Sequence, residues 1–137
     1  MRNLFRVGDT KEYRAYVTEE KLARFDAGLV HPALSTFYLV KEAEWCCRLF
    51  VLDMLEEGEE GIGVFVSAKH LSPAPLGALV VYRATLEKVE KNQIDCAYQV
   101  FWGQTLIAEG KQSQKIINKA KFDATLNALL EQVKTAQ

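Results

Sequence analysis

One segment, residues 37–55, constrains the fold more than any other part of the chain. Its apolar residues recur with helical period, Ser35 or Thr36 is placed to cap its first turn, and Gly58 follows its end. At about 100° per residue, one stripe carries Phe37, Val40, Cys47, Val51 and Leu55, with Glu42 and Asp53 on the opposite side. Much of the remaining surface is also apolar, namely Trp45, Leu49, Phe50, Leu52 and Met54. Such a helix needs other structure around it, so the sequence predicts one long central helix wrapped by the rest of the chain.

Alternating apolar and polar residues predict strands on both sides of this helix. A short strand is predicted at residues 11–17, followed by a loose segment that ends at residues 30–33. After the helix, we expect strands at residues 62–70, 79–89, 94–102 and 105–117, and a short amphipathic helix at residues 122–133. Short polar turns join the strands, so the sheet is antiparallel. The order predicts an α+β fold in which a curved antiparallel sheet wraps the long helix and a short C-terminal helix follows.

The length and the charge balance narrow the class of protein. The chain has 137 residues, 49% of them apolar, which suits a single domain of about 100–150 residues spanning residues 1–137. Seventeen Lys and Arg residues against eighteen Asp and Glu residues leave a net charge of −1. Nucleic acid is therefore not an expected partner. The sequence contains no P-loop, no dinucleotide-binding glycine motif and no zinc-ligand pattern.

Membrane spans, secretory signals and cysteine content indicate where in the cell the protein is found. No run approaches the roughly 20 apolar residues of a membrane helix, and the first ten residues lack the apolar core of a secretory signal. We therefore expect a cytoplasmic protein without a membrane partner. The cysteines, Cys46, Cys47 and Cys96, are odd in number, and we expect them to be reduced and buried.

Three polar residues stand in apolar surroundings. Glu44 lies at the centre of the apolar stripe, where a carboxylate is costly unless it faces a cavity or is paired, for example with Arg48 or Lys41. His70 ends the apolar face of its strand and could be a catalytic group or a histidine satisfied at a strand end. Thr36 could be an ordinary N-cap. Together, the three residues suggest a catalytic site. The N–H groups at the helix start near Thr36 can hold an oxyanion, and Glu44 and His70 can supply a base and an acid.

Residues 35–44 (STFYLVKEAE), residues 63–77 (GVFVSAKHLSPAPLG) and the stretch from Gly110 to Phe122 resemble the fluoroacetyl-CoA thioesterase-like branch of the hotdog-fold acyl-CoA thioesterases. The most specific part is the His-x-x-Pro-x-Pro-x-Gly run that begins at His70, with Thr36 and Glu44 eight residues apart upstream. The resemblance implies a hotdog fold and a homodimer with an acyl-CoA site at the dimer interface. It assigns catalytic roles to Thr36, Glu44 and His70, and it implies no cofactor other than the CoA of the substrate.

The chain departs from the family on the last predicted strand. The family commonly shows Gly-x-His-x-Arg, whereas this chain reads Gly110-Lys-Gln-Ser-Gln114. Gln112 and Gln114 replace the histidine and the arginine, so any substrate or dimer contact of that arginine lacks a direct counterpart, although Lys115 is adjacent. Four lysines follow without an intervening acid and could hold CoA phosphates or form a solvated sheet edge: Lys111, Lys115, Lys119 and Lys121.

Two functions of different classes follow from these residues. The first is an enzyme that hydrolyses a small acyl-CoA thioester to the free acid and CoA. The second is a non-catalytic module that binds acyl-CoA or another apolar ligand in the same pocket. Retention of Thr36, Glu44 and His70 favours the enzyme, and the glutamines at 112 and 114 favour the binding module weakly.

Overall fold

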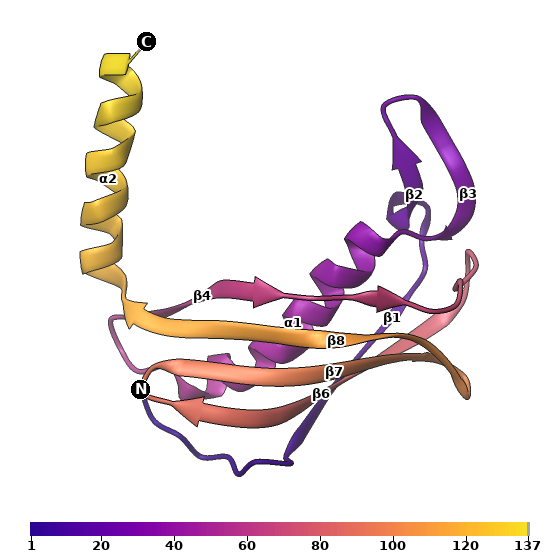
Figure 1. The fold of residues 1–137 in the computed structure, drawn as a ribbon, viewed down its shortest axis with the longest axis horizontal. Coiled ribbons are helices and arrows are strands. Elements are labelled where there is room, and N and C mark those ends of the chain that lie inside the picture. The colour runs from indigo at the N-terminus through magenta and orange to yellow at the C-terminus, as the bar shows by residue number, and fades with distance from the viewer. Residues whose placement is uncertain (137) are drawn as a thin grey trace.

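The computed structural model describes residues 1–136 as a long helix held against a curved sheet, with a hairpin and a second helix projecting from it (Figure 1). The sheet contains β1 (Thr10–Tyr16), β4 (Glu59–Val66), β5 (Lys69–His70), β6 (Leu79–Glu90), β7 (Gln93–Trp102) and β8 (Thr105–Asn118). A short 3-10 turn, η1 (Glu19–Lys21), leads into the hairpin of β2 (Leu22–Phe25) and β3 (Gly28–Leu34). The helices are α1 (Thr36–Met54) and α2 (Lys119–Ala136). The predicted central helix, the strands that follow it and the C-terminal helix are confirmed, except that the strand predicted at residues 62–70 is divided into β4 and β5.

The sheet is antiparallel, and its strand order is β1-β6-β7-β8-β4, with β5 also paired to β8. Two-residue turns connect the long central strands, and each turn contains a residue with positive φ, Lys91 at 54° and Gly103 at 59°. Such residues let the chain reverse within the twist of the sheet. Strand β4 lies at one edge and β1 at the other.

Helix α1 packs on one face of this sheet and contacts β1, β4, β6, β7 and β8. Its first turn is capped by Ser35, whose Oγ accepts a hydrogen bond from the Tyr38 N–H at 3.1 Å. The buried face of the helix consists of Leu39, Ala43, Cys46, Cys47, Phe50, Val51 and Met54. These residues form one hydrophobic core with side chains of the long strands, including Tyr82 and Tyr98. All three cysteines are buried and free, as expected.

The predicted apolar stripe on α1 is only partly correct, although Cys47 and Val51 are buried in the core. Phe37, placed in the core by the stripe, is 77% exposed, and Val40 is only partly buried. The core-facing side is instead centred on Ala43 and Cys46. Because α1 is apolar around most of its surface, periodicity alone left several rotations of the helix nearly equivalent.

Glu42, expected on the side opposite the apolar stripe, is buried. Its carboxylate binds Lys21 Nζ at 2.9 Å and accepts a hydrogen bond from the Tyr82 hydroxyl at 3.0 Å. Burial, together with this carboxylate, raises the pKa of Tyr82 and keeps its hydroxyl protonated. The lysine is also bonded to the Tyr16 carbonyl at 2.8 Å. Glu42 therefore joins α1 to the η1 turn and to β6.

The segment that was expected to be loose forms the β2–β3 hairpin. Residues 26 and 27 make its turn, and Gly28, with a φ of 117°, begins the second strand. At the hairpin base, the Leu34 N–H donates to the Ala74 carbonyl and the Leu76 N–H donates to the Pro32 carbonyl. The hairpin is thus tied to the loop of residues 71–77.

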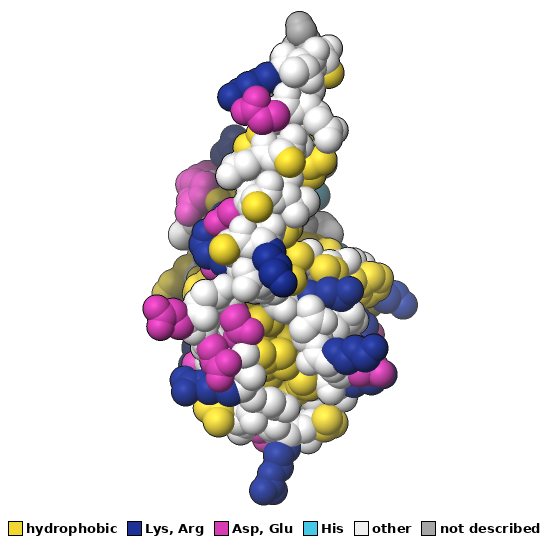
Figure 2. Space-filling view, turned by 90° about the vertical axis from the view of Figure 1, so that its left-hand side faces the viewer, with side chains coloured by type: hydrophobic (Ala, Val, Ile, Leu, Met, Phe, Trp, Pro, Cys, Tyr) yellow, Lys and Arg dark blue, Asp and Glu magenta, His cyan; other side chains and the backbone are white. Residues whose placement is uncertain are grey.

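Helix α2 is longer than the predicted terminal helix and projects from the end of β8 (Figure 1). It has no buried residue, and Figure 2 shows apolar side chains along its length, clear of the body of the molecule. Within residues 1–136, neither helix is long and apolar enough to cross a membrane.

Replacing Glu42 with Gln tests the contact that joins these parts. The change leaves Lys21 as a largely buried cation without its partner, so we expect a loss of about 3 kcal/mol in the free energy of unfolding. Urea denaturation measures this loss. Glu90→Gln is the matched control, because the Lys88–Glu90 pair is exposed and such pairs contribute less than about 1 kcal/mol. Equal losses in the two variants would contradict the structural role of Glu42.

Candidate active site

Thr36 and His70 meet at the start of α1. The Thr36 Oγ1 lies 2.9 Å from His70 Nδ1, a hydrogen-bond distance. Since Ser35 supplies the cap, Thr36 does not act as the N-cap, and its hydroxyl is turned to the histidine. The two residues come from different elements, the first residue of α1 and the last residue of β5.

Strand pairing holds His70 in place. It lies opposite Ala108 of β8, and the next two residues, Leu71 and Ser72, both donate their backbone N–H groups to the Ile107 carbonyl at 2.7 and 3.1 Å. The loop that follows is bonded to the base of the β2–β3 hairpin, which leads directly into Thr36. The pair therefore rests on ordered backbone rather than on a free loop.

The environment of His70 favours its neutral form. The side chain is partly buried, and burial lowers the pKa of its imidazole below the ordinary value; the Ser72 backbone acts in the opposite direction, and nearby His31 acts in the same direction as burial. Its Nε2 atom is buried and has no hydrogen-bond partner within residues 1–136. A neutral imidazole can accept or donate a proton near neutral pH.

A cavity of about 1020 Å³ lies beside this pair. It is lined by the first turn of α1 and by the hairpin, including Leu22, Ala23, Phe25, His31, Leu34, Phe37 and Tyr38. The lining is mostly apolar with a few polar groups, as is common for small-molecule sites. The sequence does not predict the hairpin wall, because its apolar residues do not alternate regularly. The available signal was Gly28, since glycine is common where a chain reverses.

Glu44 lies outside this cavity. It is eight residues beyond Thr36, about 12 Å along the helix at 1.5 Å per residue. Its side chain lines two separate hollows of about 450 and 490 Å³ on the outer side of α1. The structure thus brings Thr36 and His70 together within one chain, but not Glu44.

The expected partners of Glu44 are engaged elsewhere. Arg48 binds Glu60 at 2.7 Å and the Gly61 carbonyl at 2.9 Å, and the Lys41 ammonium lies over the Tyr38 ring. No hydrogen bond or ion pair of Glu44 is present within residues 1–136. The alternative in which Glu44 only pairs with Arg48 is wrong.

Strand β4 makes room for the Glu44 carboxylate through Gly63. A Cβ atom at position 63 would lie 3.1 Å from Glu44 Oε1, tighter than most real contacts. Glycine at this position therefore lets the carboxylate lie close against the strand.

Gln114 is opposite Gly63 in the β4–β8 register, and it is buried together with Gln112. Gln114 Nε2 donates to Gln112 Oε1 at 3.1 Å, and Gln112 Nε2 is buried without a partner within residues 1–136. The two glutamines form a neutral, buried amide pair on the neighbouring strand.

Two of the four lysines that could hold CoA phosphates are engaged with acids. Lys111 binds Glu87 at 2.7 Å, and Lys119 binds Asp123 at 2.9 Å. Their exposure fits a solvated surface, but the predicted sheet edge is wrong, because β8 lies between β7 and β4 and the last two lysines belong to α2. In the described part of the chain, no group of three metal-binding side chains comes together.

A protein-family model described as fluoroacetyl-CoA-specific thioesterase matches residues 17–120. The chain belongs to this family. The match includes β2, β3, α1 and all the residues of the candidate site. The resemblance recognised in the sequence is thereby confirmed.

One relative of known name and two solved structures are similar to this chain. The fluoroacetyl-CoA thioesterase of Streptantibioticus cattleyicolor is 28% identical over 90 residues, which make up 66% of this chain but only 65% of that protein. The crystal structure of a Thermus thermophilus hypothetical protein, a thioesterase superfamily member, has a TM-score of 0.91 and 36% identity, over 95% of this chain and 96% of that one. A mutant of the fluoroacetyl-CoA-specific thioesterase in complex with fluoroacetate and CoA has a TM-score of 0.80 and 25% identity, over 86% and 99%. The predicted hotdog fold is confirmed.

The histidine environment can be tested by titration. Because burial disfavours the imidazolium, we expect the ring-proton NMR signals of His70 to titrate below the ordinary midpoint of about 6.5. The His70→Gln variant assigns the signals. The unfolded chain binds this proton more readily, so the contribution of His70 to stability falls as the pH drops below about 6.5, and the variant should lose less stability over that range. A midpoint above 6.5 would contradict the burial of the ring.

Proposed function

We propose that this protein hydrolyses acyl-CoA thioesters with a small acyl group, using Thr36, His70 and Glu44 as catalytic residues. The observation that carries the proposal is the 2.9 Å contact between Thr36 and His70 on the wall of a mostly apolar cavity. Membership of the fluoroacetyl-CoA-specific thioesterase family supports the reaction class. We propose a cytoplasmic location and no cofactor beyond the CoA of the substrate.

The start of α1 suits the carbonyl oxygen of a thioester. The backbone N–H groups of Thr36 and Phe37 have no partner within residues 1–136, whereas those of Tyr38 and Leu39 bond to Ser35. Free N–H groups at a helix start stabilise negative charge that develops on an oxygen. In our proposal the carbonyl oxygen lies there, and the Thr36 hydroxyl and the His70 ring orient it.

Glu44 supplies the base. Its carboxylate takes a proton from water, the water oxygen bonds to the carbonyl carbon, and the carbon–sulfur bond then breaks. The CoA thiolate leaves and takes up the proton that Glu44 removed from water, which the neutral His70 ring can relay, and Glu44 returns to its carboxylate form. Direct attack by the carboxylate on the carbonyl carbon is the alternative route, with water cleaving the resulting anhydride.

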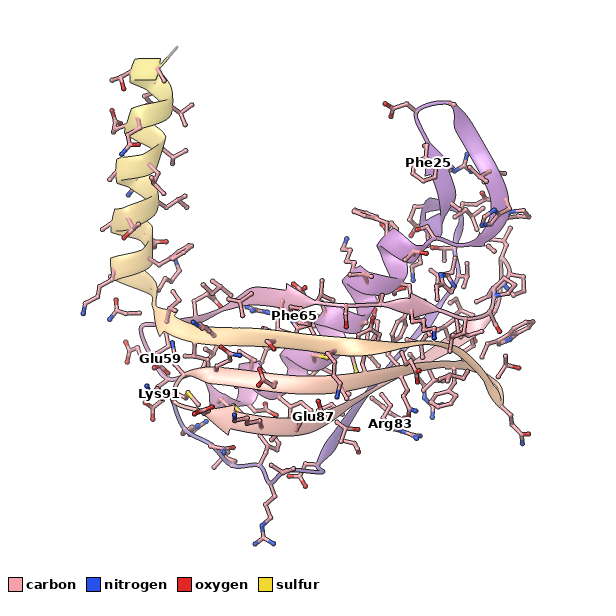
Figure 3. The ribbon with its side chains drawn as sticks, in the orientation of Figure 1. Phe25, Glu59, Phe65, Arg83, Glu87 and Lys91 are labelled. Carbon is pink, nitrogen blue, oxygen red and sulfur yellow. The ribbon has the colours of Figure 1, made fainter. Side chains whose placement is uncertain are left out.

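Glu44 and the Thr36–His70 pair require a second copy of the chain to meet. The outer face of α1 with Phe37 and the edge strand β4 are both unpartnered in one chain, and Val64, Phe65 and Val66 of β4 are 39–56% exposed. Figure 3 shows Phe65 on this strand, between the two projecting arms. Unpaired apolar edges favour pairing with another strand.

We therefore propose a homodimer in which the β4 strands of two copies pair antiparallel. The two α1 helices then lie side by side in opposite directions on one face of a continuous sheet. In that arrangement Glu44 of the partner subunit approaches Thr36 and His70. The acyl-CoA binds at this interface, and each dimer has two such sites.

A non-catalytic binding module is the second candidate. The observation that favours it is the buried Gln112–Gln114 pair at positions where the family commonly has a histidine and an arginine. Turnover separates the two candidates, because a binding module retains acyl-CoA but releases no free thiol.

The Glu44→Gln variant tests the enzyme directly. The change keeps the shape but removes the base, so thiol release from short acyl-CoAs should fall about 100-fold or more, with stability unchanged or higher. Asp53→Asn is the control on the same helix, since Asp53 only pairs with Lys11 at the surface. Wild-type rates in Glu44→Gln would reject Glu44 as a catalytic residue, and an inactive wild type that still binds acyl-CoA would favour the binding module.

A further inference from the structure

Helix α2 presents an apolar face that the rest of residues 1–136 leaves about half exposed. Its 18 residues include Phe122, Leu126, Leu129, Leu130 and Val133, all 41–51% exposed. At about 100° per residue, Phe122, Leu126, Leu129 and Val133 lie within roughly 60° of one another. Isolated helices of this length are marginal in water, and packing of an apolar face is the usual source of their stability.

The chain itself does not bring α2 to the candidate site. Helix α2 begins where Asn118 pairs with Glu59, at the start of β4. His70 pairs with Ala108, ten residues away along β8, or about 33 Å at 3.3 Å per residue. Figure 1 shows α2 and the β2–β3 hairpin at opposite ends of the molecule, projecting past the β4 edge in the same direction.

Antiparallel pairing of two β4 strands brings α2 of one chain close to the candidate site of the other. It places the start of one β4 beside the end of the other, so α2 of one copy comes to the end of the partner that carries β5. That end also presents exposed apolar side chains. Leu71 is 44% exposed, Leu76 is 45% exposed and Val30 of the hairpin is 60% exposed.

We propose that the apolar face of α2 packs on the 71–77 loop of the partner subunit, where it covers the rim of the Thr36–His70 cavity. The inference rests on the dimer of the proposed function. The 71–77 loop is bonded both to the hairpin base and, through Leu71 and Ser72, to β8 beside His70. A helix seated on this loop therefore borders the cavity, and the site is complete only when the partner supplies α2.

The similarity to a solved structure extends into α2. The similarity to the Thermus thermophilus protein covers 95% of this chain, which leaves about seven of its 137 residues unmatched. Even if all of these lay in α2, most of the helix would have a counterpart. A structural counterpart for most of α2 supports treating this helix as part of the folded protein.

Cross-linking of the full chain tests the proposal. In the Leu76→Cys/Leu129→Cys variant, a short bis-maleimide should join two chains and give a band of twice the monomer mass. The two positions lie too far apart within one chain for the reagent to join them. Cys46, Cys47 and Cys96 are at most 2% exposed, so the wild type should remain unlinked.

Leu76→Cys/Glu131→Cys is the matched control, because Glu131 is on the opposite side of α2. We expect at least fivefold less cross-linked dimer from this control. A dimer that fails to cross-link through Leu129, equal yields from the two variants, or a monomer in light scattering would each overturn the proposal. Thiol release is measured separately on the wild type. If the variant cross-links but the wild type releases no thiol, the proposed function is rejected, while the packing of α2 on the partner subunit is supported.

Discussion

The packing of α1 into the curved sheet fixes the position of every group in the candidate site. Small residues, Ala43 and Cys46 above all, let the helix approach the strands closely, and Phe50 fills the space beyond them. With its buried side fixed, the helix must begin beside β5. Thr36 then meets His70, and the outward side of the helix carries Glu44 against the glycine of β4.

Two glutamates only two residues apart on α1 have opposite roles because of what surrounds them. Glu42 is enclosed, and Lys21 and Tyr82 satisfy its carboxylate, so it connects the helix to η1 and to the sheet. Glu44 has room but no partner within the described chain. A carboxylate with a fixed cation holds structure together, whereas one left free beside an unpartnered surface remains available for proton transfer.

The sequence was sufficient for the two helices, the antiparallel sheet and the His70 motif, because helical period, period-two alternation and short turns are local signals. It was not sufficient for the rotation of α1, since a helix apolar on most sides has no unique buried face. That ambiguity assigned Phe37 to the core and Glu42 to the surface, and the structure reverses both. The hairpin was missed because its stability comes from bonds between Leu34 and Ala74 and between Leu76 and Pro32, which link distant parts of the chain. In the proposed dimer, the Glu44 that approaches a given His70 belongs to a second chain, and no local pattern contains that information.

Mixing two inactive variants tests the central claim, that each site combines Thr36 and His70 of one subunit with Glu44 of the other. Glu44→Gln and His70→Ala homodimers should both be inactive. After subunit exchange at equal concentrations, half of the dimers are mixed and each has one intact site, so thiol release should return to about one quarter of the wild-type rate. If the three residues instead acted within one chain, every subunit in the mixture would lack one of them. The mixture would then stay as inactive as its components, and the shared site would be contradicted.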